Sequence, residues 1–192
     1  MTTIGFAICG SFCTFKQVFR EIEKLVENGY DVLPIMSENS YNFDTRFGEA
    51  KFWQDELKRL TKKEIIHTIK DAEPIGPKKL LDALVIAPCT GNTLAKLSNG
   101  IADTAVTLAT KAHLRNARPV VIAVSTNDAL SNAGKNIGNL MNYKHTYFVP
   151  FRQDSFKNKP ASCVADFSLL EKTLENALNG IQLQPILEIP IE

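Results

Sequence analysis

The chain has 192 residues, 44% of them hydrophobic, and its 22 lysines and arginines against 21 aspartates and glutamates give a formal net charge of +1. This size and apolar content suffice to bury the core of a single domain over residues 1–192, with 181–192 expected to form a C-terminal tail. The near-neutral charge gives no general attraction to nucleic acid or to anionic membranes. No signal peptide and no apolar stretch of roughly 18 residues is recognisable, so we expect a cytoplasmic protein.

The four cysteines show no metal-ligand spacing and no CxxC pair. Cys9 and Cys89 stand at the ends of apolar runs, where a thiol behaves as a small buried apolar group. We therefore expect reduced thiols and no metal site.

The start of the chain predicts a strand, a helix and a second strand. Residues 4–9 form an apolar run that stops at a Gly-Ser turn, and apolar residues then recur at helical spacing as far as Gly29. Residues 30–36 have the pattern of a second strand. Because Pro34 cannot donate a hydrogen bond to a neighbouring strand, we expect this strand near an edge of the sheet.

The segment that follows carries mixed signals. Residues 43–60 have a helical pattern with large aromatic side chains, which either fill the core or contact neighbouring subunits: Phe43, Phe47, Phe52 and Trp53. For residues 61–72 both a helix and a strand remain open, because 61–64 match a capping box while 65–69 are strand-like. Residues 79–82 are expected to form a short helix.

The second half of the chain alternates strands and helices. The expected strands are residues 83–87, 119–124 and 147–149. The expected helices are one that begins after Thr90, residues 103–114, a short one to which the polar, glycine-rich residues 131–139 lead, and residues 166–178. Residues 152–161 are expected to be loop. Runs that are apolar at every position are typical of parallel strands covered on both faces. The alternation predicts an α/β fold, a doubly wound parallel sheet in three αβα layers.

Two polar turns stand where apolar strands give way to helices. Gly10 and Ser11 follow the first strand, and Thr90, Asn92 and Thr93 follow the central one. Carboxyl ends of parallel strands and helix N-termini both favour anions, so these turns predict a phosphate site, with ordinary helix capping as the alternative. The absence of a G-x-G-x-x-G fingerprint disfavours an ordinary dinucleotide site.

Residues 10–16 and 87–103 resemble the two signature regions of a flavoprotein family, the homo-oligomeric flavin-containing cysteine decarboxylases. This family includes phosphopantothenoylcysteine decarboxylases and flavin prenyltransferases. The resemblance runs from residue 4 to about residue 178. It implies a flavodoxin-like fold that binds FMN at the carboxyl ends of its strands, in a homo-oligomer that is usually a trimer, with the flavin between subunits.

The resemblance assigns most of the expected site residues. Those expected to bind the cofactor are Gly10, Ser11, Phe12, Ser37, Thr90, Gly91, Asn92 and Thr93. Asn127 falls where the decarboxylases carry a substrate-clamping asparagine, with a strand-end turn residue as the alternative. The segment after it offers amides and a cation, so Lys135 and Asn136 are expected to bind a substrate carboxylate, with a solvated surface loop as the alternative.

The chain departs from the family pattern at two places. An ungapped count to the position of the decarboxylases' histidine lands on Pro74, and His67 lies seven residues further from the central motif. We expect His67 to be a packed residue. Flavin prenyltransferases carry an arginine where Ser125 stands. Neither decarboxylation nor prenyl transfer is therefore favoured, and no residue is identified as catalytic.

Within the family, the resemblance is strongest to B subunits that act with a separate A subunit in sporulating cells. The pair would oxidise a cyclic dihydro-dicarboxylate, with FMN in this chain or NAD(P) in the A subunit, which resembles pyridine-nucleotide-binding proteins, accepting the hydride. Two alternatives remain: a stand-alone FMN-dependent decarboxylase or prenyltransferase, and a non-catalytic subunit that binds FMN or phosphate.

Overall fold

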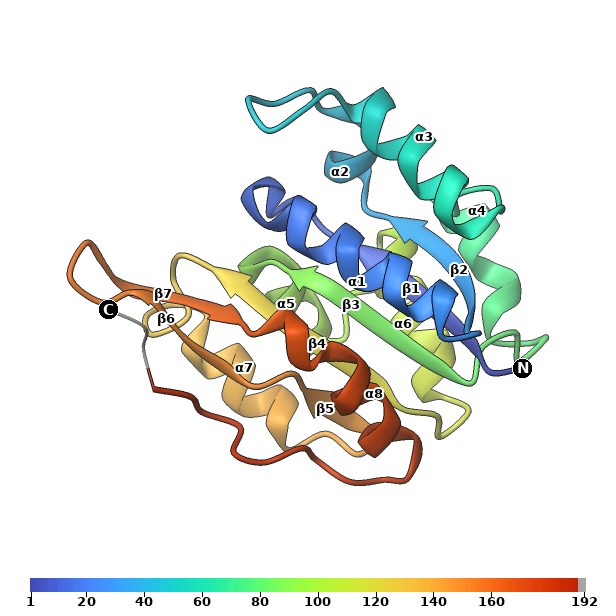
Figure 1. The fold of residues 1–192 in the computed structure, drawn as a ribbon. Helices are drawn as coiled ribbons and strands as arrows, with labels where there is room; N and C mark the ends of the chain where they lie inside the picture. The colour runs from blue at the N-terminus through green and yellow to red at the C-terminus, as the bar shows by residue number, and fades with distance from the viewer. Residues whose placement is uncertain (190–192) are drawn as a thin grey trace.

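The structure, a computed structural model, describes residues 1–189. Its centre is a seven-stranded sheet in the order β2-β1-β3-β4-β7-β6, with β5 also paired to β4 (Figure 1). The strands are β1 (Thr3–Ile8), β2 (Asp31–Met36), β3 (Ala83–Cys89), β4 (Val120–Thr126), β5 (Thr146–Phe148), β6 (Phe151–Ser155) and β7 (Lys159–Ala165). Strands β1 to β5 pair in parallel, whereas β7 runs antiparallel to β4 and to β6.

Helices cover both faces of this sheet (Figure 1). One layer holds α1 (Phe15–Glu27), α3 (Ala50–Thr61) and α8 (Leu170–Leu178). The other holds α4 (Ile69–Ala72), α5 (Gly91–Ser98), α6 (Ala105–Leu114) and α7 (Gly134–Met141). The short elements are α2 (Glu38–Asn42), η1 (Phe12–Thr14), η2 (Glu73–Ile75) and η3 (Phe167–Leu169). This arrangement is the expected flavodoxin-like three-layer fold.

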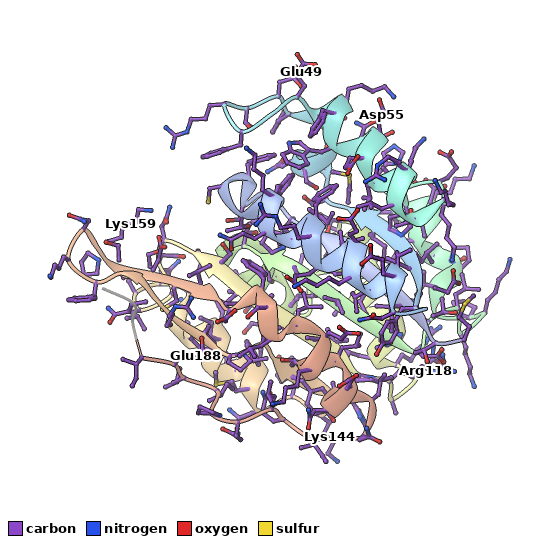
Figure 2. All side chains as sticks on the ribbon, in the orientation of Figure 1. Glu49, Asp55, Arg118, Lys144, Lys159 and Glu188 are labelled. Atoms are coloured by element: carbon purple, nitrogen blue, oxygen red, sulfur yellow. The ribbon has the colours of Figure 1, made fainter. Side chains whose placement is uncertain are left out.

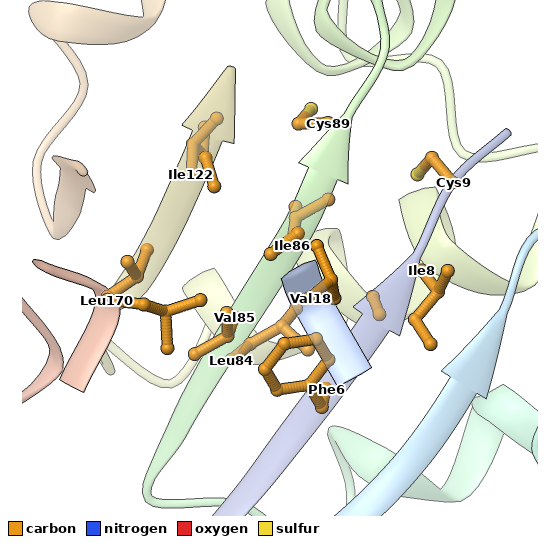
Figure 3. Packing of buried hydrophobic residues seen from close by; sticks show 14 of the residues in the cluster. Phe6, Ile8, Cys9, Val18, Leu84, Val85, Ile86, Cys89, Ile122 and Leu170 are labelled. Atoms are coloured by element: carbon orange, nitrogen blue, oxygen red, sulfur yellow. The ribbon is translucent and has the colours of Figure 1, made fainter. Parts of the chain in front are cut away.

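Burial on both faces explains why the central strands are apolar at every position. All seven residues of β3 are buried, and β1 and β4 each have a single partly exposed residue. Figure 3 shows Phe6, Val85 and Ile122 of these strands in one cluster with Val18 of α1 and Leu170 of α8. Because both faces of these strands are apolar, helices must cover the sheet on both sides, and this explains the alternation of strands and helices along the chain.

Two local predictions about the start of the chain are confirmed. Gly29 follows the C-cap of α1 with φ +86°, a left-handed conformation that glycine adopts without a steric penalty. Strand β2 lies at one edge of the sheet, as expected from Pro34. The carbonyl of Pro34 still accepts a hydrogen bond from Ile66, at 2.9 Å.

The prediction of one helix over residues 43–60 is wrong at its N-terminal end. Helix α3 begins at Ala50, and the seven residues before it form a loop with a turn in which Thr45 and Gly48 exchange backbone hydrogen bonds. Gly48 has φ +137°, which interrupts a helix. Of the four aromatic residues noted in this region only Trp53 is buried, and its ring packs on Phe19 at 4.9 Å between centroids.

The open segment 61–72 contains neither a long helix nor a strand. Thr61 is the last residue of α3 rather than a cap, and Ile66 makes a single parallel bridge to Ile35 at the end of β2. A short helix, α4, follows. The expected helix at 79–82 is absent, and Lys79 has φ +50°, which no helix accommodates.

The prediction that residues 152–161 are loop is wrong, because most of them belong to the β6–β7 hairpin. The hairpin extends the sheet beyond β4, where Thr126 pairs with Cys163. Residues 181–189 of the expected tail return along β6: Phe151 bonds to the backbone of Ile186 and Glu188, at 3.0 Å each. Residues 190–192 lie outside the described part. Within residues 1–189, no helix is both long and apolar enough to cross a bilayer.

We expect a pH-dependent stability from His113 on α6. The ring is buried, and burial lowers the pKa of His113 from 6.5 to about 4. The hydrogen bond that Nε2 donates to the carbonyl oxygen of Pro119, at 3.0 Å, opposes this shift but is outweighed by burial. As the pH falls from 6.5 towards 4, the unfolded chain takes up the proton first. The free energy of unfolding should then decrease by up to about 3 kcal/mol.

Urea denaturation at several pH values measures this effect. His113→Gln should have a flatter profile between pH 6.5 and 4 than the original protein. Equal slopes for the two proteins would contradict the assignment.

Candidate functional site

The carboxyl ends of β1, β3 and β4 meet at one edge of the sheet, and side chains tie their turns together. The hydroxyls of Ser11, after β1, and Ser125, near the end of β4, share a hydrogen bond of 2.7 Å. Thr93, in the first turn of α5, donates to the sulfur of Cys9 at 3.3 Å. These contacts join segments that are more than 80 residues apart in sequence.

Next to the Ser11–Ser125 pair is a pocket of about 240 Å³. Its wall carries hydroxyl groups from four different segments, together with the backbone of Gly10 and the amide of Asn127. The hydroxyl-bearing residues are Ser11, Thr14, Thr90, Ser125, Thr126 and Ser162. Hydroxyls and free backbone amides are donors that suit a phosphate or carboxylate.

Four of the residues expected from the sequence line this pocket: Gly10, Ser11, Thr90 and Asn127. Thr90 is also the N-cap of α5, since its hydroxyl accepts from the amide of Thr93 at 3.4 Å. Thr90 therefore both caps α5, the alternative that the sequence left open, and lines the pocket. The first amides of α5 point towards this edge because the helix begins directly after Thr90.

The other expected cofactor residues lie near the pocket without lining it. Phe12 packs on Phe15 at 5.1 Å between centroids, and the hydroxyl of Ser37 caps α2 by accepting from the amide of Ser40 at 3.3 Å. Asn92 is exposed and Thr93 is buried against Cys9. Ser37 remains close to the site, since its amide bonds the carbonyl of Ile8 at 2.9 Å.

Gly91 has a packing role at the junction of α5 with the loop after β4. A Cβ on this residue would lie 2.7 Å from the carboxylate Oδ1 of Asp128 and 2.7 Å from the hydroxyl of Thr126. Those two groups are themselves joined by a hydrogen bond of 2.6 Å. Only glycine lets the helix start approach this pair so closely.

The two residues expected to bind substrate beyond Asn127 are not in the pocket wall. Lys135 is exposed on the first turn of α7, and Asn136 beside it is buried. The charged residues that do line the pocket, Asp154 and Lys159, belong to the β6–β7 hairpin. Figure 2 shows Lys159 at the end of the molecule opposite Arg118.

Sequence reasoning missed the hairpin residues because the segment was interpreted as loop. Alternation of larger apolar and polar side chains, which marks many strands, is weak here. In Lys159–Ala165 the larger apolar side chains are confined to Cys163 and Val164. Ser162 lines the pocket together with these two residues. The Lys-Asn-Lys sequence at 157–159 was the available turn signal.

The buried thiols at this edge are packing groups. Burial raises the pKa of Cys9 to about 11 and that of Cys89 well above its ordinary value. The hydrogen bond from Thr93 favours the thiolate of Cys9 but is outweighed by burial. Both thiols stay protonated near neutral pH, and Figure 3 shows them at the ends of neighbouring strands.

His67 lies at the same edge but lines a separate pocket of about 340 Å³, with Glu38, Asn42 and Asp103 among its neighbours. Its ring stacks on Tyr41 at 3.8 Å between centroids, and its buried Nδ1 has no hydrogen-bond partner within the described residues. The ring is thus packed, as expected, and it is held beside β2 by the bridge at Ile66. Pro74 lies in η2.

Comparison with known proteins places the chain in a family. A model of the Flavoprotein family matches residues 1–165, and the chain belongs to that family. It is 49% identical over 184 residues to the B subunit of dipicolinate synthase from Bacillus subtilis (strain 168), an alignment that spans 96% of this chain and 92% of the relative.

Solved structures agree. The B subunit of dipicolinate synthase from Bacillus halodurans matches with a TM-score of 0.91 at 44% identity, covering 99% of this chain and 97% of that one. The FMN-dependent cysteine decarboxylase SpaF, at 22% identity and a TM-score of 0.67, shares the fold over 92% of this chain and 97% of its own. The resemblance inferred from residues 10–16 and 87–103 is confirmed.

The close approach at Gly91 leads to a stability prediction. Gly91→Ala should disrupt the Thr126–Asp128 hydrogen bond and lower the free energy of unfolding by about 1–2 kcal/mol. The matched control is Gly138→Ala in α7, where a Cβ meets nothing within 4 Å. That change should raise the free energy of unfolding by up to about 1 kcal/mol. Denaturant titration measures both, and equal effects of the two changes would contradict the packing role.

Proposed function

We propose that this chain is the flavin-binding B component of a dipicolinate synthase built from two different subunits. The 49% identity to the B subunit of a dipicolinate synthase, over nearly the full length of both chains, carries this proposal. The pocket at the carboxyl edge of the sheet supports it, because it offers anion-binding groups at the edge where open parallel sheets bind their ligands.

The residues of the pocket fit the phosphate of FMN. Gly10 and Ser11 form a small polar turn, and Thr90 and Ser125 place further hydroxyls beside it. The one carboxylate in the described wall, Asp154, is paired with Lys159 at 3.1 Å, so the wall carries no net negative charge. A dianionic phosphate would therefore meet hydroxyl and amide donors beside a carboxylate whose charge is balanced.

The reaction we propose converts a dihydrodipicolinate-type precursor into dipicolinate, a planar pyridine with two carboxylates. Aromatisation of the ring removes one hydride equivalent and one proton. Bound FMN supplies a two-electron acceptor, and NAD(P) on the A subunit is the other candidate for that role. This chain's own contribution is to hold the planar dicarboxylate at the carboxyl edge, through the amide of Asn127 and the hydroxyl of Ser162, which are not used for the phosphate.

We further propose that the chain is an oligomer and is catalytically incomplete alone. Within the described residues, the pocket wall offers hydroxyls, an amide and thiols but contains no histidine. The two ionised side chains of this wall, Asp154 and Lys159, form an ion pair with each other. Three large aromatic side chains around the loop before α3 are exposed and available for subunit contacts: Phe43, Phe47 and Phe52. The FMN dependence of SpaF supports a flavin site in this chain, and the name of the related B subunits supports a partner subunit.

FMN titration tests the site. Ser11→Leu should fill the pocket and abolish FMN binding, while circular dichroism shows an unchanged fold. Ser125→Ala removes the partner hydroxyl without adding bulk, so it should weaken binding only about tenfold or less. Ser131→Leu, on an exposed loop outside the pocket, is the control for an added leucine. Normal FMN binding by Ser11→Leu would overturn the proposed position of the phosphate.

Turnover assays test the subunit role. The purified chain should form dipicolinate from the dihydro precursor only when the A subunit is added, and light scattering should show an oligomer. A monomer that forms dipicolinate unaided would contradict the proposal. A chain that binds FMN but adds nothing to the activity of the A subunit would favour the non-catalytic flavin-binding alternative.

A further inference from the structure

We propose that Lys159, at the end of the β6–β7 hairpin, binds one carboxylate of the dicarboxylate substrate. The inference rests on the proposed function for the identity of the substrate, and on the geometry of the hairpin for the residue. It assigns the role to a lysine on a different element from Lys135, the cation expected from the sequence.

The first observation is the placement of charge. Within the described wall of the 240 Å³ pocket, Lys159 is the one cation, and Asp154 is the one anion. The two face each other across the hairpin, with Nζ 3.1 Å from the carboxylate of Asp154. A charge-assisted hydrogen bond to a carboxylate is roughly twice as strong as a neutral one, and Lys159 is the residue in this described wall that can supply it.

A second cavity, of about 710 Å³, lies on the other side of the same wall. It shares five lining residues with the smaller pocket: Cys13, Thr14, Asp154, Lys159 and Val164. Lys159 therefore stands at the boundary between the two cavities. A dicarboxylate held by Asn127 and Ser162 in the smaller pocket would bring one carboxylate towards this boundary.

The other cations of the larger cavity are placed differently. Arg152 is held by two carboxylates, Asp166 at 3.2 Å and Glu188 at 2.7 Å, so its charge is already balanced. Arg20, on α1, lines the larger cavity and not the smaller one. Of these cations only Lys159 borders both spaces.

The pair with Asp154 does not prevent ligand binding. The side chains of Lys159 and Asp154 are 57% and 39% exposed, and ion pairs open to solvent contribute little to stability. A substrate carboxylate can replace Asp154 as the partner of the ammonium group at small cost. Asp154 then holds Lys159 beside the pocket until a carboxylate arrives.

A neutral donor stands on the same side for the second carboxylate. The Oδ1 atom of Asn127 accepts from the hydroxyl of Ser162 at 3.5 Å, which leaves the amide nitrogen of Asn127 free to donate. Lys159, Asn127 and Ser162 thus combine one cation with neutral donors, a set that suits a planar dicarboxylate.

The test compares dipicolinate with picolinate, which has one carboxylate on the same ring, as ligands of the reconstituted A–B complex. Lys159→Met keeps the apolar stem and removes the charge. It should weaken dipicolinate binding, and raise the KM for the dihydro precursor, about tenfold or more, with a smaller effect on picolinate. Lys159→Arg should restore most of the affinity. Asp154→Asn should bind dipicolinate at least as tightly as the original protein, because a repelling carboxylate is removed.

Two lysine variants serve as controls. Lys157→Met removes a neighbouring hairpin charge that lies over the ring of Phe156 and lines neither cavity, so it should leave binding unchanged. Lys135→Met tests the lysine expected from the sequence. Unchanged dipicolinate affinity in Lys159→Met, an equal loss in either control, or no dipicolinate binding by the original complex would overturn the inference.

FMN titration of the same variants separates this inference from the proposed function. Lys159→Met should bind FMN like the original protein. A failure of FMN binding or of dependence on the A subunit in the original protein counts against the proposed function, whatever Lys159 does.

Discussion

The parallel pairing of β1, β3 and β4 brings the carboxyl ends of three buried strands to one edge, and the rest of the site depends on this alignment. The pairing is held by a core covered on both faces, and the close packing of its side chains fixes the register of the strands. With the register fixed, Ser11 meets Ser125 and Thr93 meets Cys9. The hydroxyl-lined pocket follows from these contacts.

The antiparallel hairpin adds what the parallel part of the sheet lacks. Strands β1, β3 and β4 supply the polar turns, which bring hydroxyls, an amide and glycine but no charge to the described pocket wall. Strand β7 pairs with the end of β4, and this pairing brings Ser162, Lys159 and Asp154 to the same edge. The charged side chains of the site therefore come from the β6–β7 hairpin, where the ammonium group of Lys159 can remain solvated until a ligand binds.

Much of this architecture could be predicted from the sequence, for a physical reason. Apolar runs such as residues 83–87 indicate a strand buried on both faces, and the turn at Thr90 indicates a helix N-terminus. In both segments the local sequence pattern predicts the position that the segment has in the fold. Gly10, Ser11 and Thr90 were expected on those grounds and Asn127 from the family resemblance, and all four line one pocket. The hairpin could not be found in this way, because Phe151–Ser155 is mostly polar and gains its strand conformation from pairing with β7.

The proposed function requires FMN to lie with its phosphate beside the Ser11–Ser125 pair. A crystal structure of the chain grown with saturating FMN is the most direct measurement of this position. We expect phosphate oxygens within hydrogen-bond distance of the hydroxyl of Ser11 or Ser125. FMN bound elsewhere, or no FMN in the pocket at saturation, would contradict this position.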